Sequence, residues 1–130
     1  MAKYNIQPCV YTNIYTFYSN VAKKYQNTFT YEDIERCVNN AYNSVYKIEN
    51  GAIRRIPTLS CWKGYYMAHI GKWYFAYTIN DDEKEGTIIT VVDARHGQNM
   101  HEQRKHKIIK ITETQFRDIL KQITPTILYS

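Results

Sequence analysis

The chain of 130 residues is long enough for one domain with a single core, and we expect residues 1–130 to form one domain. Its hydrophobic content of 44% is that of a globular protein and excludes a disordered chain. The formal net charge of +5 favours a polyanionic partner. No run of residues approaches the ~20 apolar residues of a membrane helix, so we expect no membrane partner.

The cysteines and the first residues favour a reduced, cytoplasmic setting. The three cysteines are widely spaced and form no zinc-ligand pattern. The opening "MAKYNIQPCV" lacks the apolar stretch of a signal peptide. We therefore expect a cytoplasmic protein without cofactor or metal, in which Cys9, Cys37 and Cys61 are small buried hydrophobic residues.

A strand and two helices are expected first along the chain. "YNIQPCV", residues 4–10, alternates as a strand does, and Pro8 indicates an edge position or a strand end. Hydrophobic residues then recur at helical spacing over residues 13–26. Thr30 followed by Asp33 resembles the capping box that starts a helix, and an asparagine–glycine pair ends this second helix. The short link between the helices predicts an antiparallel helical hairpin.

Strand-like runs follow the second helix. "AIRRI" is the first, and "SCWKGYYMAHIG" and "KWYFAYTIN" are joined by Gly71 and Lys72, which predict a tight hairpin. "TIITVVDA" is apolar throughout, which predicts a central strand. The more apolar alternating set is expected in the core: Trp73, Phe75, Tyr77 and Ile79. These elements predict an α+β protein whose helical hairpin packs on a small antiparallel sheet.

The C-terminal residues predict one more strand and one more helix. "KIIKIT" has the composition of a strand, and "ETQFRDILKQI" carries an apolar stripe that ends before Pro125. We expect a helix over residues 113–123, with Phe116 and Leu120 packed on the domain or on a second copy. A homodimer through this C-terminal helix is therefore one expected assembly.

The segment "DARHGQNMHEQRKHK", residues 93–107, is unusually rich in histidine and basic residues. Histidine transfers protons near neutral pH, and the arginine fork suits a phosphate. We expect Arg95, His96 and His101 to converge on one solvent-open surface as catalytic residues. The alternative is that they are solvated loop residues, and their spacing does not favour a metal site. His69, within a strand pattern, is expected to be a structural cross-strand residue.

Other basic and aromatic residues are candidates for nucleic-acid binding. Alternation places Lys72 on the same face as Tyr74, and aromatic side chains of this region can stack on bases. The run "RKHKIIK" can contact phosphates, with an ordinary solvated strand face as the alternative. The expected nucleic-acid-binding residues are Lys63, Lys72, Tyr74, Arg104, Lys105 and Lys107, to which Arg54 and Arg55 can add charge.

Several short motifs follow one another in residues 3–101. The helical hairpin is followed by "LSCWKGY", then by a strand with Gly71 and Tyr77, and then by an apolar strand with a histidine-containing end. In this order they resemble the RelE/ParE superfamily of bacterial toxins. Arg95 and His101 match the spacing of the family's late arginine and the tyrosine or histidine six positions on. Tyr74 departs from the family, whose arginine at this place supports the scissile phosphate, and residues 102–130 form an extension.

The resemblance implies a RelE-like toxin, a metal-free endoribonuclease that cleaves ribosome-bound mRNA and is neutralised by an antitoxin protein. Its expected partners are therefore an antitoxin and RNA or the ribosome. Because ParE-like members of the superfamily inhibit DNA gyrase, a second hypothesis stays open. It is a non-catalytic binding protein of the same fold, such as a gyrase inhibitor or a mobile-element or phage accessory protein.

Overall fold

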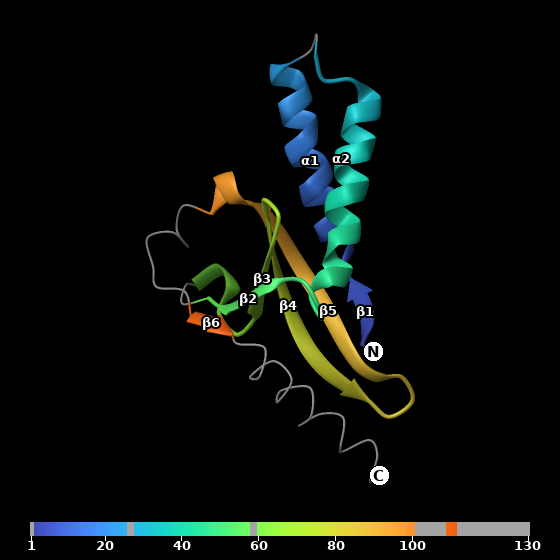
Figure 1. Cartoon of the computed structure of the whole chain (residues 1–130), viewed down its shortest axis with the longest axis vertical. Helices are drawn as coiled ribbons and strands as arrows, with labels where there is room; N and C mark the ends of the chain where they lie inside the picture. Colours follow the sequence, from blue (N-terminus) through green and yellow to red (C-terminus); the bar gives the residue numbers. More distant parts are fainter. Residues whose placement is uncertain (1, 26–27, 58–59, 101–108, 112–130) are drawn as a thin grey trace.

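The computed structural model describes residues 2–25, 28–57, 60–100 and 109–111. Within these ranges the chain forms a helical hairpin and a six-stranded sheet (Figure 1). The helices and strands in chain order are β1 (Lys3–Ile6), α1 (Pro8–Lys24), α2 (Tyr31–Asn43), β2 (Ile53–Ile56), β3 (Tyr66–Ile70), β4 (Trp73–Asp82), β5 (Gly86–His96) and β6 (Ile109–Ile111). Three short 3-10 turns are η1 (Ser44–Lys47), η2 (Ser60–Trp62) and η3 (Gly97–Asn99).

The sheet has the strand order β1-β5-β4-β3-β2-β6. The α+β class and the interior position of β5 are confirmed, but an entirely antiparallel sheet is wrong. β1 runs parallel to β5, whereas the other neighbouring strands are antiparallel. The physical reason is the connection. Strands joined by tight turns must be antiparallel, but β1 is separated from β5 by the helices and several strands, so its direction is not fixed by a hairpin.

The first helix begins earlier than the sequence pattern predicts. β1 ends at Ile6, and Pro8 is the first residue of α1 rather than part of a strand. Gln7 is extended, with φ −68° and ψ 146°, as is usual for the residue before proline. Proline suits the first helical position because its missing N–H would have no partner there. Val10, predicted in the strand, is instead fully buried from the helix.

A capping box starts α2, as predicted. The Thr30 hydroxyl accepts the Asp33 backbone N–H at 3.2 Å, and the Asp33 carboxylate accepts the Thr30 N–H at 2.9 Å. Hydrogen bonding to the Thr30 backbone, followed by the contact with Arg36, lowers the pKa of Asp33. The Thr30–Asp33 pair therefore fixes the residue at which α2, the second helix of the hairpin, begins.

Removing this cap should measurably destabilise the protein. We expect Thr30→Ala to lower the free energy of unfolding by about 1 kcal/mol, because one helix N–H loses its acceptor. Urea denaturation measures the change. Thr12→Ala is the control, since the Thr12 hydroxyl only donates to the Pro8 carbonyl within α1. Equal losses in the two variants would contradict a capping role.

Buried side chains lie on both faces of the sheet. On the face covered by α1 and α2, the helix-side core contains the predicted residues Trp73, Phe75 and Tyr77, and Ile79 is half-buried against it. A smaller cluster occupies the opposite face, called here the distal face, and consists of Trp62, Met67, Ala76 and Met100. Figure 1 shows the two helices side by side, extending past one end of the sheet.

The cysteines differ from the expectation of buried hydrophobic residues. Cys9 and Cys61 are exposed, and Cys37 is half-buried. The Cys9 thiol lies 3.0 Å from the Val92 carbonyl and donates to it from the first turn of α1. This contact uses the thiol as a polar group at the margin of the sheet, which is why burial is not required.

Two further expectations concern the ends of the chain and membranes. The strand expected in "KIIKIT" is confirmed as β6. The predicted helix over residues 113–123, its homodimer and the boundary between residues 3–101 and the extension stay predictions, because residues 112–130 lie outside the described ranges. None of the helices described is long and apolar enough to cross a membrane.

Candidate nucleic-acid interface

A β-bulge in β5 decides which face each of its last side chains occupies. Val92 is the extra residue in the register between β4 and β5. Val91, before the bulge, and Ala94, after it, both belong to the helix-side core. Strict alternation from Val91 would turn Asp93 and Arg95 toward the helices. The bulge reverses this, so Asp93 and Arg95 lie on the distal face.

Three polar side chains form a row across the distal face. His69 of β3 pairs directly with Tyr74 of β4, which pairs with Arg95 of β5. The rings of His69 and Tyr74 are stacked, with centroids 4.2 Å apart and planes 5° from parallel. All three side chains are half-buried. We call these residues the transverse row, because they bring an imidazole, a phenol and a guanidinium together on adjacent strands.

The guanidinium of Arg95 is held in place by two neighbours. Its Nε contacts Asp93 Oδ2 at 3.4 Å, and its carbon lies 5.9 Å from the ring centroid of Trp62. The Trp62 indole N–H donates to the same carboxylate oxygen at 2.8 Å, and Trp62 is almost fully buried. Because the Arg95 side chain is still 41% exposed, its fork is oriented yet reachable from solvent.

The environment of His69 favours its neutral form. Burial lowers the pKa of His69, and the positive charge of Arg55 lowers it further. Arg55 pairs with Met67, so it lies on the same face two residues along. A neutral imidazole can accept a proton at neutral pH. His69 is the cross-strand residue that its sequence pattern predicts, and it also shares a face with Arg95.

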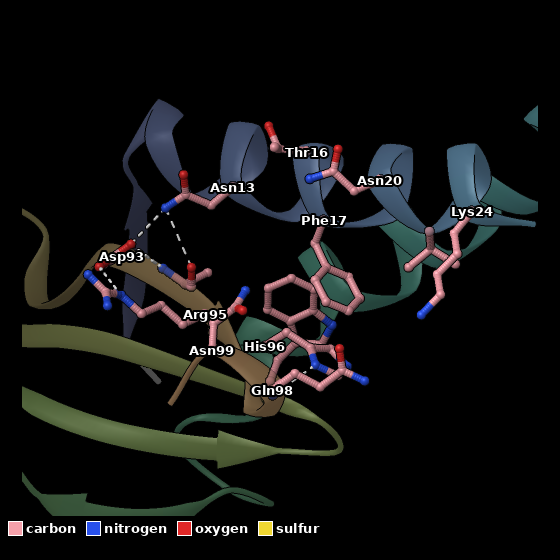
Figure 2. A pocket seen from close by; sticks show the side chains of 13 residues that line it. Asn13, Thr16, Phe17, Asn20, Lys24, Asp93, Arg95, His96, Gln98 and Asn99 are labelled. Carbon is pink, nitrogen blue, oxygen red and sulfur yellow. Dashed lines mark hydrogen bonds and ion pairs between the residues drawn. The ribbon is translucent and has the colours of Figure 1, made fainter. Parts of the chain in front are cut away.

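His96 lies on the other side of the sheet from Arg95. Its ring stacks on Phe17 of α1 at 4.0 Å and meets Trp73 edge-on at 5.4 Å. Its Nδ1 accepts the Gln98 backbone N–H at 3.2 Å. Figure 2 shows Arg95 extending toward Asp93, away from the His96–Phe17 stack. Arg95 and His96 both line the groove between α1 and β5, but their side chains leave the strand on opposite faces, because consecutive strand residues alternate, so they do not meet as a catalytic pair.

The remaining candidate residues are divided between different places. Lys63 is exposed directly after Trp62. Lys72 occupies the β3–β4 turn, where its carbonyl accepts the Gly97 N–H at 2.8 Å, and its charge lowers the pKa of the adjacent His96. Arg54 is buried and donates to the Ile48 carbonyl at 2.9 Å, which makes it structural. His101, Arg104, Lys105 and Lys107 lie outside the described residues.

Sequence patterns missed two parts of this site for different reasons. The tight turn at Gly71 and Lys72 already implies that His69 faces Tyr74, so register counting would have found that pair. The placement of Asp93 beneath Arg95 had no comparable signal, because it depends on the bulge. Within the described ranges, no group of three or more histidine, cysteine, aspartate or glutamate side chains could hold a metal ion.

The burial of His96 should make stability depend on pH. Burial, followed by the charge of Lys72, lowers the pKa of His96 below its ordinary value of 6.5. The unfolded chain then binds protons more readily than the folded protein, so stability is complete above about pH 6.5 and falls as the pH drops below it. We expect the melting temperature to fall between about pH 7.5 and about pH 5.5.

His96→Phe tests this origin, because phenylalanine keeps a ring against Phe17 but does not titrate. We expect a smaller fall in melting temperature over the same pH range than in the parent protein. Part of the fall should persist, because His69 has a lowered pKa as well. An unchanged pH dependence would show that His96 does not contribute.

Comparisons of the chain with models of protein families, with curated proteins and with solved structures found no match in any of the three. The likeness to the RelE/ParE superfamily accordingly rests on short motifs and on the order of elements.

Proposed function

We propose that the protein is a RelE-like toxin that binds RNA on its distal face and cleaves it without a metal. The observation that carries this proposal is the transverse row of His69, Tyr74 and Arg95. It combines a phosphate-binding group, a group able to accept a proton and an aromatic ring on a rigid sheet. Rigid elements are the best support for such a combination, because they fix the distances between reacting groups.

The chemistry of the row fits a single-stranded RNA. The Arg95 fork can hold a phosphate through two hydrogen bonds, and its orientation by Asp93 and Trp62 reduces the entropy lost on binding. Tyr74 and His69 present stacked rings beside it, a surface on which a base can stack. The net charge of +5 adds long-range attraction for a polyanion.

Cleavage in this proposal follows the chemistry of the RNA 2′-hydroxyl. His69 accepts the 2′-hydroxyl proton, the 2′ oxygen attacks phosphorus, and the bond from phosphorus to the 5′ oxygen breaks. The leaving 5′ oxygen takes a proton from solvent, which gives a 2′,3′-cyclic phosphate and a free 5′-hydroxyl. Arg95 stabilises the negative charge that develops on the phosphate oxygens. Tyr74 stands where the family has a second arginine, so Arg95 supplies most of this stabilisation.

A non-catalytic protein of the same fold is the second candidate. It is favoured by Tyr74 in place of the family's arginine and by the separation of His96 from Arg95. In that case the same surface would bind a nucleic acid or a protein without cleaving it. Both candidates are proposed to act in the cytoplasm, and the toxin is proposed to be neutralised by an antitoxin that covers the distal face.

Purified protein and a labelled single-stranded RNA test the proposal. We expect cleavage in the presence of EDTA, a 2′,3′-cyclic phosphate product, and no cleavage at a nucleotide whose 2′-hydroxyl is replaced by hydrogen. RNA affinity should fall steeply with salt, because bound phosphates release counterions. Because RelE-like toxins act on ribosome-bound mRNA, translating ribosomes are the second substrate, and arrest of growth on induction is the cellular measurement.

The outcomes separate the two candidates. Binding that depends on salt but yields no product, with or without ribosomes, would favour the non-catalytic protein. Soluble expression without RNA binding and without any effect on growth would reject the toxin hypothesis altogether.

A further inference from the structure

A groove of about 570 Å³ runs between α1 and the outer edge of β5, and it meets the transverse row at Arg95, which also lines it (Figure 2). One wall is a polar stripe of α1 formed by Asn13, Thr16, Asn20 and Lys24. The other wall is the end of β5 with η3, and the rings of Phe17, Trp73 and His96 line the groove between them. The spacing of the stripe, three to four residues per step, keeps its members on one face of the helix.

The edge of β5 that faces this groove has no strand beside it in the described part of the chain. β1 pairs with β5 only from Ile88 to Val91. Beyond that point, side chains satisfy the backbone of Ala94. Its N–H donates to Asp93 Oδ1 at 2.8 Å, and its carbonyl accepts from the Asn13 amide at 3.4 Å. Such caps discourage uncontrolled edge pairing, but side chains can rotate away when a strand arrives.

The dimensions suit a short extended peptide. From Asn13 to Lys24 the helix rises about 16 Å, at about 1.5 Å per residue. Residues 92–96 of β5 span a similar length of roughly 16 Å, at about 3.3 Å per residue. A segment of about five residues in extended conformation therefore fills the groove from end to end.

The lining specifies the chemistry of that segment. Alternate side chains of an added strand would point toward the rings of Phe17 and His96, which favours apolar residues at those positions. Amide groups along both walls can bond peptide groups and polar side chains. Lys24 is exposed at one end, and Asp93 at the other is already engaged by Arg95, by Trp62 and by the Asn13 amide, which donates to its Oδ1 at 2.8 Å. The unshared charge is thus positive and favours an acidic residue on the ligand.

We propose that this groove binds an extended, acidic segment of a partner protein, which pairs with β5 as an added strand beyond the end of β1. The proposal does not rest on RNA binding, because it uses the β5 backbone, the rings of Phe17 and His96 and the charge of Lys24, although Arg95 of the RNA site also lines the groove. A second copy of the chain is a poorer occupant, since each copy's β5 edge is flanked by its own α1 and would have to enter the other groove together with that helix.

Short capped peptides of alternating threonine and valine, with glutamate at the first or the last position, are the probe. We expect saturable binding by at least one of them, with shifts in the amide resonances of Ala94, His96 and Gln98. The same peptide N-methylated at alternate residues should not bind, because it cannot complete the strand ladder. Binding of the methylated peptide at equal strength, or no saturable binding by any peptide, would overturn the proposal.

Two charge-reversal variants test whether the glutamate end of the peptide lies beside Lys24. Lys24→Glu should lower the affinity for the glutamate-containing peptide by about five-fold, whereas Lys23→Glu should leave that affinity nearly unchanged. Lys23 is the matched control because it is the exposed neighbour of Lys24 on α1 and does not line the groove. Equal effects of the two variants would reject the assigned groove. A dimer that forms through this edge without any peptide would also overturn the proposal.

Discussion

Replacing His69 with phenylalanine is expected to lower RNA cleavage by about 100- to 10,000-fold, the usual contribution of a positioned acid or base. Phenylalanine retains a ring that can stack on Tyr74, so RNA affinity should change little. The measurement is the single-turnover cleavage rate of a labelled RNA, with affinity determined on a 2′-deoxy substrate. In the parent protein the rate should be constant at neutral pH and fall in acid, because the lowered pKa keeps His69 unprotonated at neutral pH.

His96→Phe is the matched control for this experiment, since it removes a histidine on the opposite face and also keeps an aromatic ring there. We expect its cleavage rate to equal that of the parent protein. If His96→Phe abolishes cleavage and His69→Phe does not, the reacting groups lie on the helix side. If neither variant matters, His69 and His96 both have structural roles, and the acid or base has to come from outside the transverse row.

Arg95→Ala is expected to weaken RNA binding by about 10- to 100-fold, because a charge-assisted contact to phosphate is lost. Cleavage should fall further than binding, since the charge on the phosphate grows during the reaction. The dependence of affinity on salt should also become shallower, as one fewer phosphate is neutralised. Fluorescence anisotropy over a series of salt concentrations measures both effects, and growth arrest on induction should be relieved.

Two other variants show whether the effect belongs to the fork of Arg95. Arg95→Lys keeps the charge but loses the planar fork, so it should restore the salt dependence without restoring full affinity. Arg36→Ala removes an exposed arginine that is paired with Asp33. Arg36 belongs to α2, which covers the face of the sheet opposite to the distal face. Arg36→Ala should bind RNA like the parent protein. A loss of affinity in Arg36→Ala as large as in Arg95→Ala would indicate non-specific charge attraction.

The groove beside α1 and the transverse row share one residue, Arg95, and the neighbouring Asp93 connects the groove to the distal face. Its Oδ1 caps the Ala94 N–H at the groove, and its Oδ2 accepts from Trp62 and Arg95 on the distal face. No sequence motif marks Asp93, because the face on which its side chain lies depends on the extra residue Val92 in the strand. The candidate site could therefore be only partly predicted: Arg95 and Tyr74 were identified as site residues, but His69 and Asp93 were not.

Local sequence determined much of the architecture. The capping box at Thr30 and Asp33 fixed the start of α2, and the glycine turn fixed the β3–β4 hairpin, because each depends on a few neighbouring residues. Hydrophobic alternation likewise determined that Trp73, Phe75 and Tyr77 belong to the core. These signals act over short distances, so they can be found without knowing what the elements pack against.

Tertiary structure alone decided which side chains meet. The direction of β1 was set by its place beside β5, and the bulge at Val92 sent Arg95 to the distal face and left His96 against Phe17. The physical reason is the two-residue period of a strand: one extra residue exchanges the two faces for everything that follows. The sequence shows that basic residues gather near the end of β5. Only the register of β3, β4 and β5 places His69 in the same row as Arg95.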